Sequence, residues 1–259
     1  MKVNLEGKHA VVCGSTQGIG KASAMQIANL GATVTLIARD ELKLEVTCSE
    51  LSTHFNQKHS YVVADFSNPV ELIKQIESIQ LPVHVLVNNS GGPSGGPIMN
   101  AKLEEFESAF SNHLKVNHIL VQRFVPGMIA CHYGRIINII STSVKAPLPN
   151  LGVSNTIRGA VASWAKTLAS ELGVYGITVN NVLPGATLTQ RLKGIIEAKA
   201  GGDHVLALEI EEAMIREIPA RRFAEPMEIA NAVAFLASPA ASYINGINLP
   251  VDGGRLMSL

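Results

Sequence analysis

The chain has few residues that could cross-link it, and no segment that could anchor it in a membrane. Its 259 residues include only three cysteines, Cys13, Cys48 and Cys131, which lie far apart. That number and spacing fit neither a disulfide framework nor a thiolate metal cluster, and they are typical of a reducing compartment. No run is long and apolar enough to cross a bilayer, and the first residues lack the apolar core of a secretion signal. We therefore expect a cytoplasmic protein with no membrane partner.

An excess of charge and a supply of aromatic residues are also missing. Lys and Arg number 21 against 21 Asp and Glu, and aromatic residues make up only 5%. Nucleic-acid binding is therefore not expected. His113 and His118 are five residues apart, which is not the spacing of a helical metal pair, and we expect no metal. Hydrophobic residues make up 47% of the chain and charged residues 16%, which suits one folded domain over 1–259.

Short runs rich in Val and Ile alternate with helical patterns along the chain. The runs, which predict strands, cover 9–14, 33–39, 60–65, 83–89, 134–141, 177–185 and 247–254. The helical patterns cover 18–30, 40–56, 69–79, 102–131, 154–173 and 226–237, with a break expected at the proline and glycine of 125–128. This alternation predicts an α/β fold, a doubly wound (Rossmann-type) parallel sheet of about seven strands with helices on both faces. Residues 188–220 fall outside the alternation and resemble two short helices around Gly201 and Gly202, so we expect a mobile substrate flap there.

The loop after the first predicted strand has the composition of a phosphate-binding turn. Gly14, Gly18 and Gly20 stand in a G-x-x-x-G-x-G pattern that opens a helix. Glycines there let the main chain approach a pyrophosphate closely, and the helix N-terminus offers free N–H groups. A glycine pattern alone is weak, but here it lies between a strand and a helix, as dinucleotide binding requires.

The end of the second predicted strand bears on the choice of cofactor. An acidic residue there would bond the ribose 2′-hydroxyl of NAD, but this chain has Arg39, with Asp40 one place later. An arginine can pair with a 2′-phosphate, so we expect NADP(H), with NAD(H) as the alternative. The competing interpretation is that Arg39 is a solvated loop charge.

Several motifs together resemble the short-chain dehydrogenase/reductase family, and the resemblance covers nearly the whole chain. They are CGSTQGIG (13–20), ADFSNP (64–69), NNSGG (88–92), the Val-Asn pair 116–117, GRIINIIS (134–141), the run 168–189 and the run 221–254. The resemblance implies hydride transfer between a nicotinamide and a carbonyl or alcohol carbon. It also implies a cofactor site built from Gly14, Ser15, Gln17, Gly18, Ile19, Gly20, Arg39, Asp65, Phe66, Asn89, Gly91, Arg158, Pro184, Gly185, Thr187 and Thr189.

The chain departs from that family at its catalytic pair. The resemblance implies that Ser141 polarises the substrate oxygen and that Asn117 holds a water molecule. The family's general-acid Tyr and the Lys four residues later align with Ser154 and Arg158, which would share one helix face. No tyrosine lies between Tyr133 and Tyr175. Because an aliphatic hydroxyl is a far weaker acid than a phenol, and arginine cannot relay a proton as lysine can, this change bears directly on the chemistry.

Three interpretations stay open. In the first, the chain is a working reductase that uses Ser141, Arg158 and a water, with Ser154 as a relay. In the second, another residue supplies the proton, the candidates being Thr142, Ser143, Lys145 and His113. In the third, the chain binds NADP(H) as a sensor, scaffold or partner subunit with little turnover.

Within the family, the sequence looks most like the 3-oxoacyl-(acyl carrier protein) reductases. This resemblance implies a ketone as substrate, with an acyl thioester as one candidate. The basic residues that could meet an acidic acyl carrier, among them Arg191, Lys193 and Arg222, are scattered along the chain. The resemblance also implies a homo-tetramer that pairs the helices 102–131 and 154–173.

Overall fold

The structure is a computed structural model that describes residues 1–80 and 82–258, and its centre is one parallel sheet. In these residues the sheet has seven strands in the order β3-β2-β1-β4-β5-β6-β7. The strands are β1 (His9–Cys13), β2 (Thr33–Ala38), β3 (Ser60–Val63), β4 (Val85–Asn88), β5 (Gly134–Ile139), β6 (Ile177–Pro184) and β7 (Asn248–Val251). The predicted doubly wound parallel sheet is confirmed.

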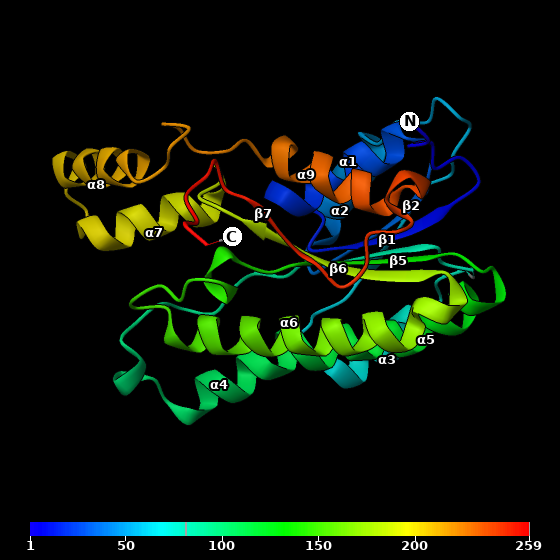
Figure 1. The fold of residues 1–259 in the computed structure, drawn as a ribbon, viewed down its shortest axis with the longest axis horizontal. Coiled ribbons are helices and arrows are strands. Elements are labelled where there is room, and N and C mark those ends of the chain that lie inside the picture. The colour runs from blue at the N-terminus through cyan, green and yellow to red at the C-terminus, as the bar shows by residue number, and fades with distance from the viewer. Residues whose placement is uncertain (81, 259) are drawn as a thin grey trace.

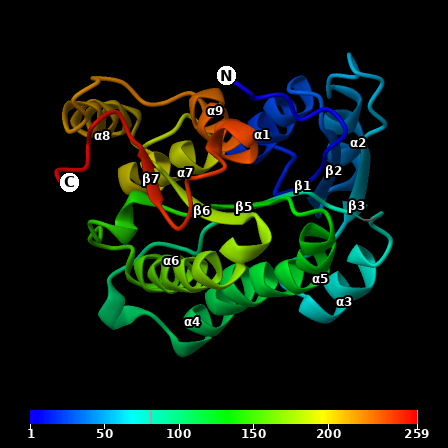
Figure 2. The same cartoon turned by 45° about the vertical axis from the view of Figure 1, so that its right-hand side comes forward.

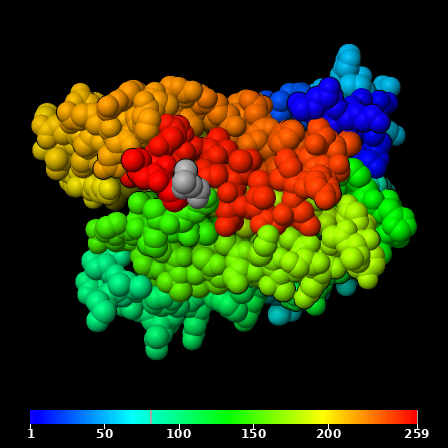
Figure 3. Space-filling view, in the orientation of Figure 1, coloured from blue at the N-terminus to red at the C-terminus, as the bar shows by residue number. Residues whose placement is uncertain are grey.

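Helices cover both faces of this sheet (Figure 1). They are α1 (Gly18–Asn29), α2 (Glu41–Ser49), α3 (Pro69–Ile76), α4 (Leu103–Phe110), α5 (Val116–Ala130), α6 (Gly152–Leu172), α7 (Gln190–Ala200), α8 (His204–Arg216) and α9 (Pro226–Ala237). Helices α1, α2 and α9 pack on one face, around a core that includes Ile27, Leu44 and Val233. Helices α3, α5 and α6 pack on the other face. Helices α7 and α8 lie together at one end of the molecule, as Figure 1 and the space-filling view in Figure 3 show, and Figure 2 shows α8 at the same end.

The chain order reverses between β1 and β4, which lie side by side although β2 and β3 separate them in sequence. In doubly wound sheets, ligands bind beyond the carboxyl ends of the strands at such a reversal. The carboxyl ends of β1, β4, β5 and β6 therefore form the edge where a site is expected.

The expected break at 125–128 is wrong. Helix α5 runs through Pro126 to Ala130, and the flanking Phe124 and Met128 are fully buried. A proline costs the helix one main-chain hydrogen bond, but burying two such side chains offsets that cost by roughly 3–6 kcal/mol. The long predicted helix is interrupted earlier, by a π-helical turn over Ser111–Lys115. Such turns occur frequently at functional sites.

A ladder of asparagine side chains crosses the buried middle of the sheet. Asn88 Nδ2 donates to Asn138 Oδ1, Asn138 Nδ2 to Asn181 Oδ1, and Asn181 Nδ2 to Asn248 Oδ1, each at 2.8 Å. The four residues lie on the adjacent strands β4, β5, β6 and β7, and the amides of Asn138 and Asn181 are each bonded on both sides, while the buried Asn88 Oδ1 at the start of the ladder has no partner among the described residues. Because buried amides are costly when unpaired, the ladder fixes the register of these strands.

Breaking the ladder in its middle is expected to destabilise the protein more than breaking it at its end. Asn138→Ala strands a donor on Asn88 and an acceptor on Asn181, at a cost of about 2–5 kcal/mol in the free energy of unfolding. Asn248→Ala strands one donor and is expected to cost about 1–3 kcal/mol. Urea unfolding measures both values, and equal costs would contradict a cooperative ladder.

Among the described residues no helix is long and apolar enough to cross a membrane. No three His, Cys, Asp or Glu side chains of that part of the chain are grouped so that they could hold a metal ion.

Candidate active site

The loop between β1 and α1 is shaped for a phosphate. Gly14 and Gly18 have φ of +56° and +55°, the left-handed region that glycine adopts without strain. A Cβ at Gly20 would lie 2.1 Å from the Gly14 carbonyl oxygen, so only glycine allows this approach of loop and helix. Helix α1 has no side-chain cap at Gln17 and no acidic residue in its first turn, which leaves its N–H groups available. This cradle fits the pyrophosphate of a dinucleotide.

The neighbouring strands hold the loop in place. Asn89, just after β4, donates from Nδ2 to the carbonyl oxygens of Cys13 and Gly14, both at 3.2 Å. Ser15 is fully buried, and its hydroxyl lies 3.4 Å from the Ile37 carbonyl of β2. Gly91 is exposed in the loop that follows Asn89.

Beyond β2 and β3, Arg39 is the exposed group of the right charge for a 2′-phosphate. Asp40 is engaged elsewhere, because its side chain caps α2 by accepting from the Lys43 N–H at 3.1 Å and pairs with Lys43 Nζ at 3.0 Å. Asp65 accepts from the Ser67 N–H at 2.9 Å, and this bond, together with the charge of Arg39, lowers the pKa of Asp65. Phe66 beside it is partly buried against the core.

The segment after β6 closes over the same loop. Pro184 ends β6, and the Thr187 hydroxyl donates to the Gly185 carbonyl at 3.0 Å. Thr189 caps α7, and a Cβ on Gly18 would meet its Cγ2 at 3.1 Å. The start of this segment is fixed to Ala224 by two main-chain hydrogen bonds. The Leu188 N–H donates to the Ala224 carbonyl, and the Ala224 N–H donates to the Ala186 carbonyl.

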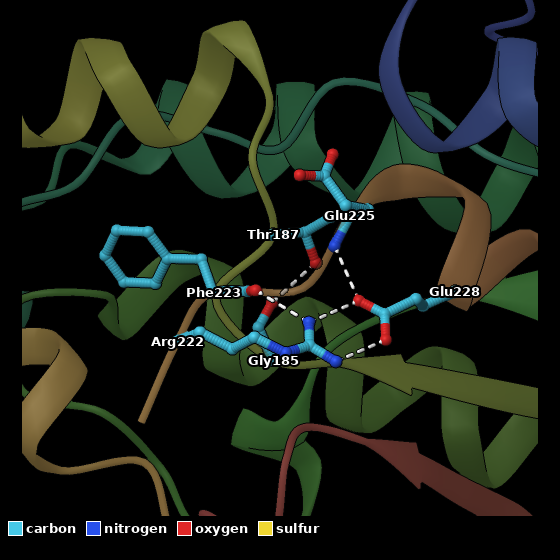
Figure 4. A network of polar contacts seen from close by, with 6 residues as sticks. All are labelled: Gly185, Thr187, Arg222, Phe223, Glu225 and Glu228. Carbon is cyan, nitrogen blue, oxygen red and sulfur yellow. Dashed lines mark hydrogen bonds and ion pairs between the residues drawn. The ribbon is translucent and has the colours of Figure 1, made fainter. Parts of the chain in front are cut away.

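An ion pair lies beside the start of this segment, at the N-terminus of α9. Figure 4 shows Arg222 bound to Glu228 through both of its terminal nitrogens, at 2.6 Å each, while the Glu225 N–H donates to Glu228 at 2.9 Å. These groups lie at the surface and tie Arg222 and Phe223 to the start of α9, beside the Gly185–Thr187 turn.

The four residues expected to be catalytic come from three neighbouring elements. Ser141 lies just beyond β5, and its Oγ accepts from the Ser143 N–H at 3.1 Å. Because that bond uses a lone pair, the hydroxyl proton is free to donate to another group. Asn117 is buried in the first turn of α5, directly after the π-helical turn. Ser154 and Arg158 are both buried on α6, as their spacing predicted.

Arg158 is held against the end of β5. Its Nη1 donates to the Ile139 carbonyl at 2.8 Å, two residues before Ser141. Burial, and to a smaller degree the charge of Arg191, lowers its pKa to about 10, so the guanidinium stays protonated at neutral pH. The other proposed proton sources differ in setting, since Lys145 is exposed and the buried Ser143 hydroxyl has no partner among the described residues.

The structure pairs the buried His113, one of the candidate proton sources, with the partly buried Ser90, which the sequence did not single out. His113, in the π-helical turn, is bonded through Nδ1 to the hydroxyl of Ser90 at 2.7 Å. Ser90 follows Asn89 in the NNSGG motif, and no signal in the sequence placed it beside His113. Burial, then the charges of Arg158 and Arg191, lower the pKa of His113 to about 3, so the imidazole is neutral at pH 7.

This setting makes His113 a source of acid sensitivity. In the unfolded chain His113 has its ordinary pKa of about 6.5 and binds a proton below that pH, whereas in the folded chain its pKa is about 3 and it stays neutral until the pH falls that far. Stability is therefore lost as the pH falls, by about 2 kcal/mol from this residue between pH 7 and pH 5. We expect His113→Gln to lose that much less on acidification in urea unfolding, whereas His118→Gln, on the exposed face of α5, should follow the natural protein.

Arg191 is a second group whose place the sequence did not predict. It is the second residue of α7, and its Nη1 and Nη2 donate to the carbonyl oxygens of Gly92 and Pro93, both at 2.9 Å. It therefore connects the 188–220 segment to the loop after β4, across the edge that carries Ser141.

The parallel sheet and its glycine loop define a Rossmann-type nucleotide-binding protein. A family model described as enoyl-(acyl carrier protein) reductase matches residues 14–255. The chain is 35% identical over 263 residues to the 3-oxoacyl-(acyl-carrier-protein) reductase FabG of Rickettsia bellii, covering 98% of this chain and 99% of the relative.

Solved structures agree with this match. L-sorbose reductase from Gluconobacter frateurii, solved with NADPH and L-sorbose, superimposes with a TM-score of 0.93 at 31% identity, covering 100% of both chains. YwfH, described as an NADPH-dependent reductase involved in bacilysin biosynthesis, superimposes with a TM-score of 0.89 at 27% identity, covering 97% of this chain and 99% of that one. The chain belongs to the short-chain dehydrogenase/reductase family of oxidoreductases.

Proposed function

We propose that this protein reduces a ketone with NADPH at a site in which Ser154 and Arg158 replace the family's Tyr and Lys. One observation carries the proposal: Ser141 lies at the same edge of the sheet as the glycine cradle, and its hydroxyl can still donate a hydrogen bond because it only accepts one from Ser143. The relatives support it, since reductases solved with NADPH or NADP share this fold.

In this proposal, bound NADPH supplies the hydride that adds to the carbonyl carbon. Ser141 donates a hydrogen bond to the carbonyl oxygen, and Arg158 stabilises the negative charge that develops there. Arg158 also holds the nicotinamide ribose, and Asn117 holds a water molecule. The proton for the new hydroxyl comes through that water, with Ser154 as relay. Ser154 is a weaker acid than a phenol, but general acid catalysis contributes only about 10²–10⁴-fold, so turnover is slowed rather than abolished.

The remaining cofactor contacts are proposed from the family pattern. Arg39 would bind the 2′-phosphate, which favours NADP(H) over NAD(H), and the engagement of Asp40 with Lys43 supports this preference. The residues of the cradle would hold the pyrophosphate, and those after β6 would line the nicotinamide. Comparing the dissociation constants of NADPH and NADH tests the preference.

A second function has one observation in its favour. The helix that should carry the phenolic acid carries Ser154, and no tyrosine lies between Tyr133 and Tyr175. On that ground the chain could bind NADP(H) as a sensor, scaffold or partner subunit with little turnover.

NADPH oxidation against a carbonyl panel separates the two functions. The panel includes 2-ketones, sugar ketones and a short 3-oxoacyl thioester. The proposal expects at least one compound to be reduced to its alcohol with equimolar NADPH consumption. NADPH binding without consumption across the panel would favour the second function.

We further propose a cytoplasmic homo-tetramer of single-domain subunits, with residues 188–220 as a flap over the substrate. The pairing of subunits would use α5 and α6. Light scattering tests the assembly, because a mass equal to the 27.5 kDa monomer would contradict it.

A further inference from the structure

Two guanidinium groups stand near the candidate site without a counter-charge. Arg158 is only 9% exposed and donates one hydrogen bond, to the Ile139 carbonyl. Arg191 donates to two carbonyl oxygens and to no acid. In the part of the chain that the structure describes, no carboxylate lies within 4 Å of either group, whereas Arg222 and Arg255 both have acidic partners.

These two cations belong to one electrostatic environment. The charge of Arg191 acts on Arg158, and both arginines add to the effect of burial, which is the larger cause of the lowered pKa of His113. Arg158 is buried, and a buried cation without an anion is costly because one main-chain carbonyl compensates it only in part, whereas Arg191 is exposed. The site therefore carries positive charge that a bound anion would neutralise.

The position of the cations indicates which molecule would supply the anion. The phosphates of a dinucleotide are accounted for by the cradle of Gly14–Gly20 and by Arg39. Arg158 is bonded to Ile139 at the end of β5, two residues before Ser141. Arg191 is bonded to the carbonyl oxygens of the loop after β4. Gly92 lies directly beneath it, because a Cβ there would be 2.8 Å from Arg191 Nη2.

We propose that the substrate is a small oxo acid, whose carboxylate is held by Arg191 and Arg158 beside the carbonyl that Ser141 polarises. The substrate class rests on the proposed reduction, but the anion site does not. The planar fork of an arginine matches a carboxylate through two parallel hydrogen bonds, and Arg191 has N–H groups left over from its two carbonyl contacts. A free oxo acid therefore fits this site better than its uncharged thioester.

Equilibrium binding without turnover tests the proposal. The protein is saturated with NADP⁺, so that no hydride is available, and titrated calorimetrically with 2-oxobutanoate, 3-oxobutanoate and the methyl ester of each. We expect at least one acid to bind about 10-fold or more tightly than its ester, because the ester lacks the charge. Arg191→Gln is expected to weaken binding of that acid by about 10- to 100-fold and leave the ester unchanged.

Two further variants guard against indirect effects. Lys193→Gln removes the same charge two residues along α7, at a position that is exposed like Arg191 but lies on a different face of the helix, and should change acid binding by less than about 2-fold. Arg191→Lys keeps the charge but not the fork, and should recover part of the affinity. Equal binding of acids and esters, no binding of either acid, or an equal loss in Lys193→Gln would overturn the proposal.

The outcomes separate this inference from the proposed function. Acid binding that depends on Arg191 in a protein that never oxidises NADPH would keep the anion site and overturn the reductase. Reduction of neutral ketones by a protein that does not prefer the acids would keep the reductase and overturn the anion site.

Discussion

Gly20→Ala is expected to weaken NADPH binding by about 100-fold or more. The added Cβ would lie 2.1 Å from the Gly14 carbonyl oxygen and 2.7 Å from Asn89 Nδ2. Neither atom can yield cheaply, because one belongs to the main chain and the other bonds the loop to β4 through Cys13 and Gly14. The loop would have to move away from α1, and the N–H groups that cradle the pyrophosphate would no longer converge. Fluorescence titration with NADPH measures the loss.

Gly159→Ala is the matched control for that substitution. It makes the same chemical change in helix α6, at a position where a Cβ meets nothing within 4 Å. Alanine is the better helix former, so this variant should be as stable as the natural protein or more so, with its NADPH affinity intact. Unchanged NADPH affinity in Gly20→Ala would contradict the assignment of this loop to the cofactor.

Ser141→Ala is expected to lower kcat by about 10²–10³-fold, the usual cost of losing one donor to a developing oxyanion. The Ser141 hydroxyl accepts from the Ser143 N–H, which fixes its direction and leaves its proton for the substrate oxygen. No cofactor contact is assigned to this side chain, so the affinity for NADPH should not change. Steady-state rates and NADPH titration of the same preparation separate the two effects.

Ser143→Ala serves as the control two residues away. Its hydroxyl is buried and has no partner among the residues described, while its N–H, which orients Ser141, survives the substitution. We expect kcat to stay within about 3-fold of the natural value, as for removal of a hydroxyl that contacts nothing. An equal loss in both variants would instead indicate that Ser143 supplies the proton.

The sequence predicted those parts of the fold that depend on neighbours along the chain. Runs of Val and Ile predicted the strands, and the spacing of Ser154 and Arg158 predicted their shared face on α6. The glycine loop was recognisable because a strand-to-helix turn has its own local chemistry. The break expected at Pro126 was wrong because burial of Phe124 and Met128 outweighs a local propensity.

Contacts between distant segments could not be predicted in this way. The asparagine ladder depends on the register of four strands that are separated by up to 160 residues, Asn88 to Asn248. Arg191 reaches Gly92 and Pro93 across 99 and 98 residues, so its sequence neighbours gave no sign of its place. The Ser90–His113 bond likewise requires the π-helical turn that brings His113 to the end of β4.

The central claim is that this site transfers hydride without a phenolic acid. The most direct measurement follows deuterium from C4 of labelled NADPH into the alcohol formed by the natural protein, beside the double variant Ser154→Tyr, Arg158→Lys. We expect deuterium in the product of the natural protein, at a rate that Ser141→Ala lowers. A natural protein that binds NADPH and transfers no deuterium, while the double variant does, would contradict reduction by this site and favour a cofactor-binding protein that has lost its acid.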